Sequence, residues 1–163
     1  MKSWILWSFI FRKPEELEFL KNNLIFKGLS QKELNKAIEF LHKRSYRKGE
    51  NIVSFGEPGF ALYIIVSGKV DVLVPGNSSE KDSFVKVDTL ERGEFFGEMA
   101  LVTESFRTAT IKCVEDTEVY VLTRSALENL IECQPEIASK VLYNIAGVIA
   151  ERLKKLNEQL MSQ

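Results

Sequence analysis

The chain has 163 residues, of which 45% are hydrophobic and 28% are charged, and its formal net charge at pH 7 is −1. This length and composition are typical of one globular domain with its own core, and the weak charge argues against a nucleic-acid partner. One histidine and two cysteines, without a C-x-x-C pair, exclude the usual zinc, haem and iron–sulfur sites, so we expect no cofactor. Two separate thiols without a cleavable signal peptide predict a cytoplasmic protein.

The first segment, residues 1–13, is apolar and aromatic, and it ends in Arg12 and Lys13. It is too short to span a bilayer, which takes about 20 apolar residues. Two interpretations remain open. The segment packs on its own domain or on a partner subunit, or it makes a peripheral membrane contact, with aromatic rings at the headgroups and basic residues near anionic lipid.

Residues 14–43 have the spacing of N-terminal helices. Pro14 begins a helical stretch with a leucine stripe at Leu17, Leu20 and Leu24, and a glycine at position 28 ends it. Ser30 and Glu33 have the spacing of a capping box, in which each side chain satisfies the other's backbone amide. The apolar residues that follow predict a helix over residues 31–43.

Residues 44–123 change to short apolar runs separated by glycine and proline. The alternation Val70-x-Val72-x-Val74 is typical of a strand with one buried face. We expect strands at residues 52–55, 61–66, 69–74, 84–90, 109–114 and 117–122. The polar stretch 75–83 predicts an exposed hairpin loop, and many short strands predict a barrel or a sandwich.

Residues 124–163 return to helical spacing, with a short helix at 124–132 and a long one from Pro135 to about Leu160. The long helix carries two apolar stripes. The first comprises Ile137, Val141, Ile145 and Val148; the second comprises Leu142, Ala146, Ile149, Leu153, Leu156 and Leu160. The second stripe has the steps of four and three of a coiled-coil seam. We therefore expect a homodimer through this C-terminal helix.

The stretch 93–110 combines three groups suited to one ligand. Gly97 permits a tight turn into a short helical turn at 98–101, whose free amides suit an anion. Arg107 offers a planar, permanently charged donor fork that suits a phosphate. Glu98 would repel an anion, but it suits a ligand that also presents hydroxyl donors, as a ribose does. Each residue alone is ordinary, and together they indicate a nucleotide.

The runs FGEMAL at 96–101 and RTAT at 107–110 closely resemble the phosphate-binding cassette of cyclic-nucleotide-binding domains. These domains occur in the catabolite activator protein, the regulatory subunits of cAMP-dependent protein kinase and cyclic-nucleotide-gated channels. The upstream runs KGENIV, GEPG and LYIIVSGKV are similar to the first half of the same β-roll. The resemblance covers about residues 25–155. It implies an α+β fold, an antiparallel, jelly-roll-like β-roll flanked by N-terminal helices and a long C-terminal helix.

The resemblance also implies roles for residues of the cassette. Glu98 would accept a hydrogen bond from the ribose 2′-hydroxyl, and Arg107 would pair with an exocyclic phosphate oxygen. The other residues expected around the phosphate are Gly97, Met99, Ala100, Thr108 and Ala109. The hydroxyl at Thr108 resembles that of cGMP-preferring domains, but domains that answer to cAMP also carry one, so the ligand is cAMP or cGMP.

The purine is expected between apolar residues of the β-roll and the final helix. The residues expected to line it are Val72, Val85 and Val87, with Asn157 of the last helix as a hydrogen-bonding partner of the base or as a solvated side chain. Phe60 stands where many relatives place an acidic residue.

The expected function is that of a non-enzymatic sensor. A cyclic nucleotide binds, the C-terminal helix repositions, and an unidentified downstream protein responds. The alternative is a dimeric interaction or membrane-adapter module that keeps the fold without the ligand. An enzyme is disfavoured because the sequence offers no nucleophile–base pair, and no helix-turn-helix is recognised after the long helix, so direct nucleic-acid binding is not expected.

Overall fold

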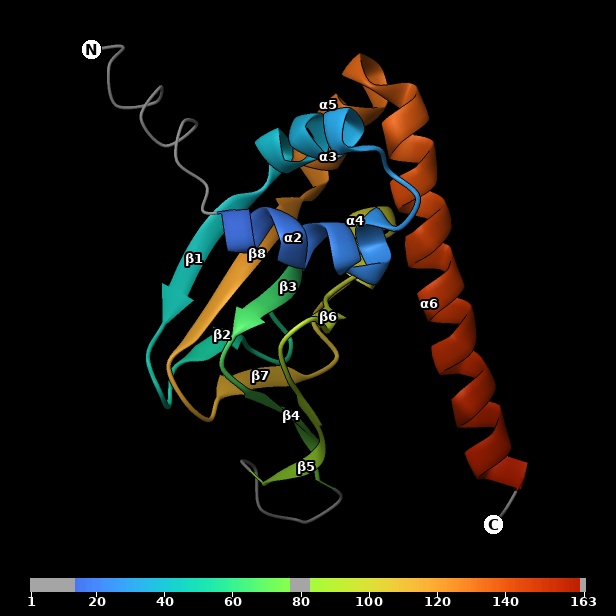
Figure 1. The fold of residues 1–163 in the computed structure, drawn as a ribbon. Helices are drawn as coiled ribbons and strands as arrows, with labels where there is room; N and C mark the ends of the chain where they lie inside the picture. The colour runs from blue at the N-terminus through green and yellow to red at the C-terminus, as the bar shows by residue number, and fades with distance from the viewer. Residues whose placement is uncertain (1–13, 77–82, 162–163) are drawn as a thin grey trace. The chain divides into compact units, whose positions relative to one another are not determined.

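The computed structural model describes residues 14–76 and 83–161 (Figure 1). The aromatic segment 1–13 and most of the loop expected at 75–83 lie outside the described residues. The chain divides into two compact units. The β unit is Leu41–Glu128, and the helical unit comprises the segments up to Phe40 and from Asn129.

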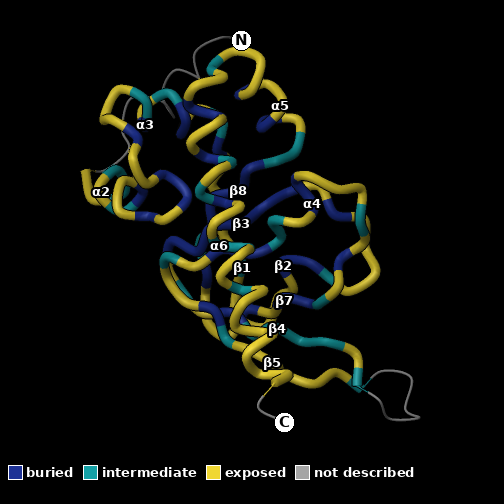
Figure 2. The backbone as a smooth tube through the Cα atoms, turned by 90° about the vertical axis from the view of Figure 1, so that its right-hand side faces the viewer, coloured by how far each residue is buried: buried dark blue, intermediate teal, exposed yellow. Residues whose placement is uncertain are grey.

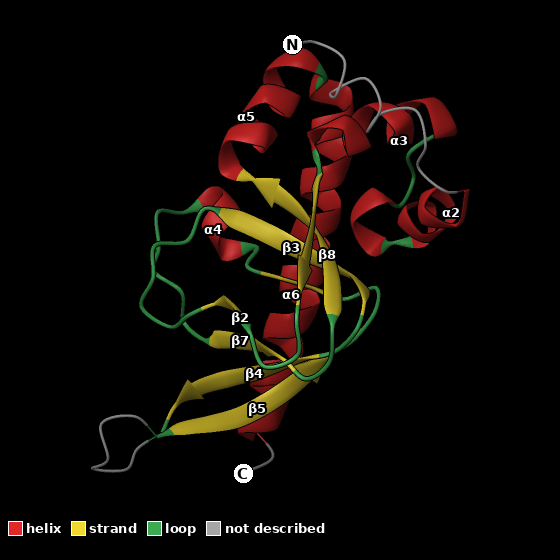
Figure 3. Cartoon of the chain, turned by 90° about the vertical axis from the view of Figure 1, so that its left-hand side faces the viewer, coloured by secondary structure: helices red, strands yellow, loops and turns green. Residues whose placement is uncertain are grey.

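The described part of the β unit contains two four-stranded sheets, and every strand pairing in them is antiparallel (Figure 3). The first has the order β1-β8-β3-β6, with β1 (His42–Tyr46), β8 (Thr117–Thr123), β3 (Ala61–Ser67) and β6 (Phe95–Phe96). The second has the order β2-β7-β4-β5, with β2 (Asn51–Val53), β7 (Thr110–Cys113), β4 (Val70–Pro75) and β5 (Phe84–Leu90). The expected α+β fold with an antiparallel β-roll is therefore confirmed.

The core of the β unit is built from both sheets. One of its inner strands is β3, an apolar run in which every residue from Ala61 to Val66 is buried, as the dark blue tube in Figure 2 shows. From the second sheet, Val70 is fully buried and Val72 packs against the same cluster. The alternation along β4 therefore turns one face of that strand toward the core.

Two strands were not expected from the sequence. The helix predicted over 31–43 is shorter than expected, because α3 (Gln31–Ala37) and the 3₁₀ turn η2 (Ile38–Phe40) are followed by β1. β1 is an edge strand whose side chains are largely exposed. Its residues therefore do not alternate between apolar and polar, and the sequence carries no local signal for this strand. The other unexpected strand, β6, has only two residues.

The helical unit begins with α2 (Pro14–Asn22) and the 3₁₀ turn η1 (Leu24–Phe26). The expected leucine stripe ends early, since Leu24 is exposed and Asn23 caps a new turn through the Ile25 amide. The capping box before α3 is confirmed. The Glu33 amide donates to Ser30 Oγ at 3.3 Å, and the Ser30 amide donates to Glu33 Oε2 at 2.7 Å.

The C-terminal helices agree closely with the sequence prediction. β8 continues into α5 (Arg124–Cys133), and α6 spans Pro135–Met161. Within the helical unit α6 packs against η1, and Asn144 Nδ2 donates to the carbonyl oxygens of Ile25 at 3.0 Å and Lys27 at 2.8 Å. One apolar stripe of α6 is largely buried, while three residues near its end remain exposed: Leu153, Leu156 and Leu160. Among the described helices, none has the length and apolar character needed to cross a bilayer.

Candidate functional site

The candidate site is built where two loops of the β unit pair with each other. The Arg107 amide donates to the Glu57 carbonyl at 2.8 Å, and the Gly56 amide donates to the Arg107 carbonyl at 2.9 Å. Pro58 and Phe106 form an isolated antiparallel bridge next to these bonds, and beyond it the Gly59 amide donates to the Ser105 carbonyl at 2.9 Å. The backbone on both sides of Arg107 is therefore fixed before any ligand is considered.

The Arg107 side chain is turned into the protein, and the residue is only 8% exposed. Its Nη2 donates to the Ala61 carbonyl at 3.1 Å, and its Cζ lies 5.5 Å from the centre of the Tyr63 ring. The Tyr63 ring is stacked on Phe96, with 5.0 Å between ring centres and 8° between ring planes. The cation thus rests on an aromatic pair contributed by β3 and β6, a geometry that favours Arg over Lys.

Among the described residues, no carboxylate forms an ion pair with Arg107. A guanidinium has five N–H donors, and the side-chain hydrogen bond found for it here goes to a neutral carbonyl, that of Ala61. Burying a charge is costly unless the charge is paired and hydrogen-bonded. The arrangement therefore suits an anion that brings its own negative charge and several acceptor oxygens.

Two glycines allow the backbone to approach this arginine closely. Gly97 has φ +80°, and a Cβ there would lie 2.7 Å from Arg107 Nη1 and 2.7 Å from the Ala61 carbonyl oxygen. A Cβ on Gly59 would lie 2.8 Å from the Ala100 Cβ and 3.3 Å from Arg107 Cζ. The sequence predicts Gly97 as the residue that permits a tight turn. In the structure the absence of a side chain at Gly97 also leaves space for Arg107.

The short helix expected at 98–101 is present one residue later, as α4 (Met99–Val102). Glu98 is half-buried and directly precedes it. The Ala100 amide, one of the donors expected in the phosphate cradle, already donates to the Gly97 carbonyl at 3.2 Å. The expected contact of this amide with a phosphate stays a prediction, as do those of the amides near Met99 and Ala109.

The structure brings together Gly97, Glu98, Met99, Ala100 and Arg107, all of which lie at or next to the turn into α4. Thr108 is exposed and Ala109 is half-buried on the segment that leads from Arg107 into β7.

The residues expected around the base lie farther along the second sheet and in the helical unit. Val72 pairs with Ile111 of β7, so β4 lies beside the strand that leaves Arg107. Val85 and Val87 lie on the next strand, β5, and are 52% and 56% exposed. Asn157 is exposed on α6 in the helical unit, so its contact with a base stays a prediction.

Sequence reasoning missed the residues that surround Arg107. Tyr63 and Gly59 belong to the runs that carried the family resemblance, but nothing local in the sequence assigns them to this arginine. Phe96 stacks on Tyr63 because β3 and β6 pair at these two residues. Only the three-dimensional pairing of distant strands reveals this group.

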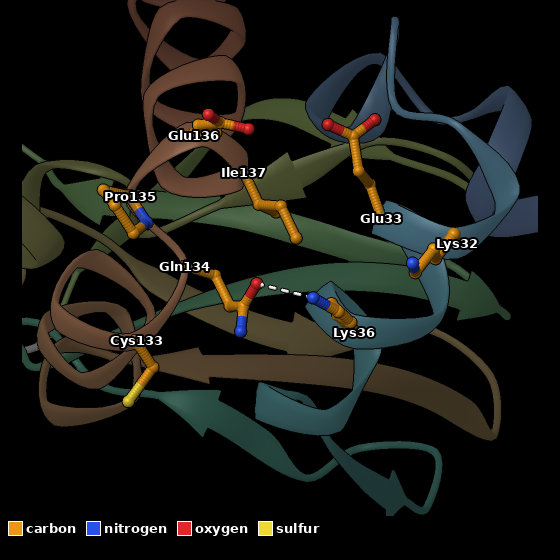
Figure 4. Close-up of a pocket in the computed structure, with 8 residues that line it drawn as sticks. All are labelled: Lys32, Glu33, Lys36, Cys133, Gln134, Pro135, Glu136 and Ile137. Carbon is orange, nitrogen blue, oxygen red and sulfur yellow. Dashed lines mark hydrogen bonds between the residues drawn. The ribbon is translucent and has the colours of Figure 1, made fainter.

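A pocket of about 270 Å³ lies elsewhere, within the helical unit (Figure 4). None of the expected site residues lines it. Its charged residues are either paired or exposed. Lys36 Nζ donates to Gln134 Oε1 at 3.0 Å, Glu33 pairs with Lys140 at 2.7 Å, and Lys32 and Glu136 are exposed. It therefore lacks the unpaired buried charge that distinguishes the surroundings of Arg107.

Comparison with known proteins agrees with this geometry. A family model described as cyclic nucleotide-binding domain matches residues 43–133. The chain is 33% identical over 141 residues to the cyclic AMP receptor protein of Thermus thermophilus, covering 86% of this chain and 62% of that protein. It is also 33% identical over 152 residues to a cGMP-dependent protein kinase of Drosophila melanogaster, covering 92% of this chain and 16% of the kinase.

Solved structures show the same likeness. The Thermus thermophilus catabolite activator protein superimposes with a TM-score of 0.74 at 34% identity, covering 84% of this chain and 61% of that one. A cyclic nucleotide-binding domain from Methylobacillus flagellatus has a TM-score of 0.80 at 20% identity, covering 91% and 84%, and so shares the fold. The chain spans less than two thirds of the curated relatives it matches first. By the matched family model and the fold around Arg107, the chain belongs to the cyclic nucleotide-binding domain family.

Proposed function

We propose that the β unit binds a cyclic nucleotide whose phosphate is held by Arg107. The observation that carries this proposal is the burial of Arg107 without an ion-pair partner among the described residues. A cyclic phosphate supplies one negative charge and two exocyclic oxygens, which match the planar fork of a guanidinium. Binding then supplies the negative charge that the described residues do not place beside Arg107.

The remaining residues surround the rest of the ligand. Glu98 accepts a hydrogen bond from a ribose hydroxyl, while Gly97, Met99, Thr108 and Ala109 border the phosphate. Ala100 borders the phosphate as well, through amides near the start of α4.

The base is bordered by apolar side chains. Val72, Val85 and Val87 flank it, and exposed Val85 and Val87 gain burial when a purine covers them. Asn157 is the candidate for a hydrogen bond to the base.

The ligand is cAMP or cGMP. The relatives include a protein named as a cyclic AMP receptor and another named as a cGMP-dependent kinase, at equal identity. The hydroxyl of Thr108 is exposed, next to Arg107, where it can reach a ligand. Calorimetry with both nucleotides distinguishes them.

The output is regulatory rather than catalytic. Ligand binding favours one arrangement of the C-terminal helix, and a downstream protein responds to that arrangement. The exposed leucines of α6, Leu153, Leu156 and Leu160, support a homodimer as the responding assembly.

Isothermal titration calorimetry with cAMP and with cGMP tests this proposal, on protein freed of bound nucleotide. We expect a Kd in the micromolar range or lower for one of them. Arg107→Ala should weaken binding by roughly 10- to 150-fold, because a charge-assisted hydrogen bond contributes about 1.5–3 kcal/mol. Arg44→Ala is the matched control, since Arg44 is exposed and donates to the neighbouring Lys43 carbonyl.

Two results would contradict the proposal. The first is the absence of heat with either nucleotide from a folded, ligand-free protein, which would favour the interaction or membrane-adapter module. The second is equal binding by the wild type and the Arg107→Ala variant, which would place the ligand elsewhere.

A further inference from the structure

The side chain of Arg124, the first residue of α5, donates hydrogen bonds to several backbone carbonyl groups. Its Nη2 donates to the Thr103 carbonyl at 2.7 Å and to the Ala100 carbonyl at 2.8 Å, and its Nε donates to the Ala100 carbonyl at 3.2 Å. The same Nη2 lies 3.4 Å from the Gly59 carbonyl oxygen. All three acceptors belong to the two segments that surround Arg107, although Arg124 is distant from both in sequence.

These contacts hold the C-terminal end of α4. The last carbonyl groups of a helix have no partner within it and carry its negative partial charge. Arg124 supplies both donors and a positive charge there, and its Nη1 also lies 3.9 Å from Glu104 Oε1. A lysine in its place would offer one compact ammonium group and could not reproduce the planar fork.

Arg124 itself is held firmly in place. Its amide donates to the Phe60 carbonyl at 2.8 Å, which anchors it to the residue after Gly59. The following turn is capped by Thr123 Oγ1, which accepts from the Ala126 amide at 3.2 Å. The guanidinium therefore projects from a fixed backbone, and α4 lies between two arginines: Arg107 contacts Gly97 before it, and Arg124 binds its last turn.

We propose that Arg124 is a positioning residue for the nucleotide site, which fixes α4 against the loop at Gly59 and so holds Gly97 and Glu98 in their binding geometry. This inference rests on the proposed binding function. Because Arg124 also begins α5, its hydrogen bonds connect α4 directly to that helix.

The test compares Arg124→Met, which keeps much of the apolar stem without the donors, with Arg124→Lys. The affinity is measured by calorimetry for the nucleotide that the wild type binds, cAMP or cGMP. Arg124→Met should lower this affinity about tenfold, and Arg124→Lys should lower it less. Arg44→Met is the control. Hydrogen–deuterium exchange on the ligand-free protein should become faster in residues 97–103 and 56–60, with β3 and β8 unchanged.

The outcomes separate the two proposals. No binding by the wild type would overturn the proposed function and, with it, the site that Arg124 serves. Wild-type binding with unchanged affinity in Arg124→Met would overturn this inference alone. Exchange that rises equally in residues 97–103 and in β3 and β8 would also overturn it, because Arg124 would then stabilise the whole unit rather than position α4.

Discussion

At the scale of single residues, Gly59 lies in a tightly packed position between α4 and Arg107. A methyl group there would come within 2.8 Å of the Ala100 Cβ and 3.3 Å of Arg107 Cζ. Added atoms in a packed site cost about 1–3 kcal/mol, because neighbours must move. We expect Gly59→Ala to lower the free energy of unfolding by that amount and to weaken nucleotide binding, measured by urea denaturation and calorimetry.

Gly147 provides the matched control for this substitution. It lies in the interior of α6, and a Cβ there would meet nothing within 4 Å. Gly147→Ala should raise the free energy of unfolding by about 0.5–1 kcal/mol, because alanine loses less backbone entropy in a helix. Unchanged stability and affinity in Gly59→Ala would show that the loop relaxes without disturbing Arg107.

At the scale of elements, the start of α3 depends on one carboxylate. Glu33 accepts from the Ser30 amide and pairs with Lys140 of α6. The hydrogen bond from Lys140, followed by those from Ser30, lowers the pKa of Glu33 to about 2 from 4.5. Since the folded state holds the charged form, the resulting stability is present above pH 4.5 and is lost as the pH falls toward 2.

Glu33→Gln should therefore destabilise the protein at pH 7. The difference from the wild type should shrink between pH 4.5 and pH 2, measured as the urea midpoint at a series of pH values. Glu39→Gln, at an exposed position of η2, serves as the control. A difference that stays constant down to pH 2 would mean that the charge of Glu33 plays no part.

The sequence predicts the elements whose signals are local. The capping box at Ser30 and Glu33, the buried run of β3 and the bounds of α6 all follow from spacing within a few residues. β1 does not, because an exposed edge strand is defined by its pairing with β8 and not by its own side chains.

The same distinction applies to the candidate site. Gly97, Glu98 and Arg107 lie within one stretch of chain, so their spacing is visible in the sequence. Tyr63 and Arg124 come from β3 and α5, and they reach the site only when the sheet forms. The spacing of residues within one segment thus predicts the groups expected to contact a ligand. The residues that orient these groups can be identified only once the folded structure is known.

At the scale of the whole molecule, the exposed end of α6 determines the expected assembly. Leu153, Leu156 and Leu160 are all more than half exposed and follow the spacing of a coiled-coil seam. We expect sedimentation velocity to give the mass of two chains for the wild type and of one chain for Leu156→Glu, because a charge at a seam is costly to bury.

Tyr143→Ser is the matched control for the dimer. Tyr143 is 81% exposed on α6 but belongs to neither apolar stripe, so its replacement should leave the assembly unchanged. A wild type that sediments as one chain at all concentrations, or a Leu156→Glu variant that remains a dimer, would contradict this assembly.

The order β1-β8-β3-β6 has a consequence for how the protein is made. Synthesis proceeds at about 5–20 residues per second, so β1 exists for seconds before the ribosome has produced β8, its partner in the sheet. Such distant pairing also makes folding slow. In that interval the charged residues of β1, Lys43 and Arg44, discourage pairing with strands of other nascent chains. The charged residues that remove the apolar alternation from β1 thus also disfavour its pairing with other chains until β8 has been synthesised.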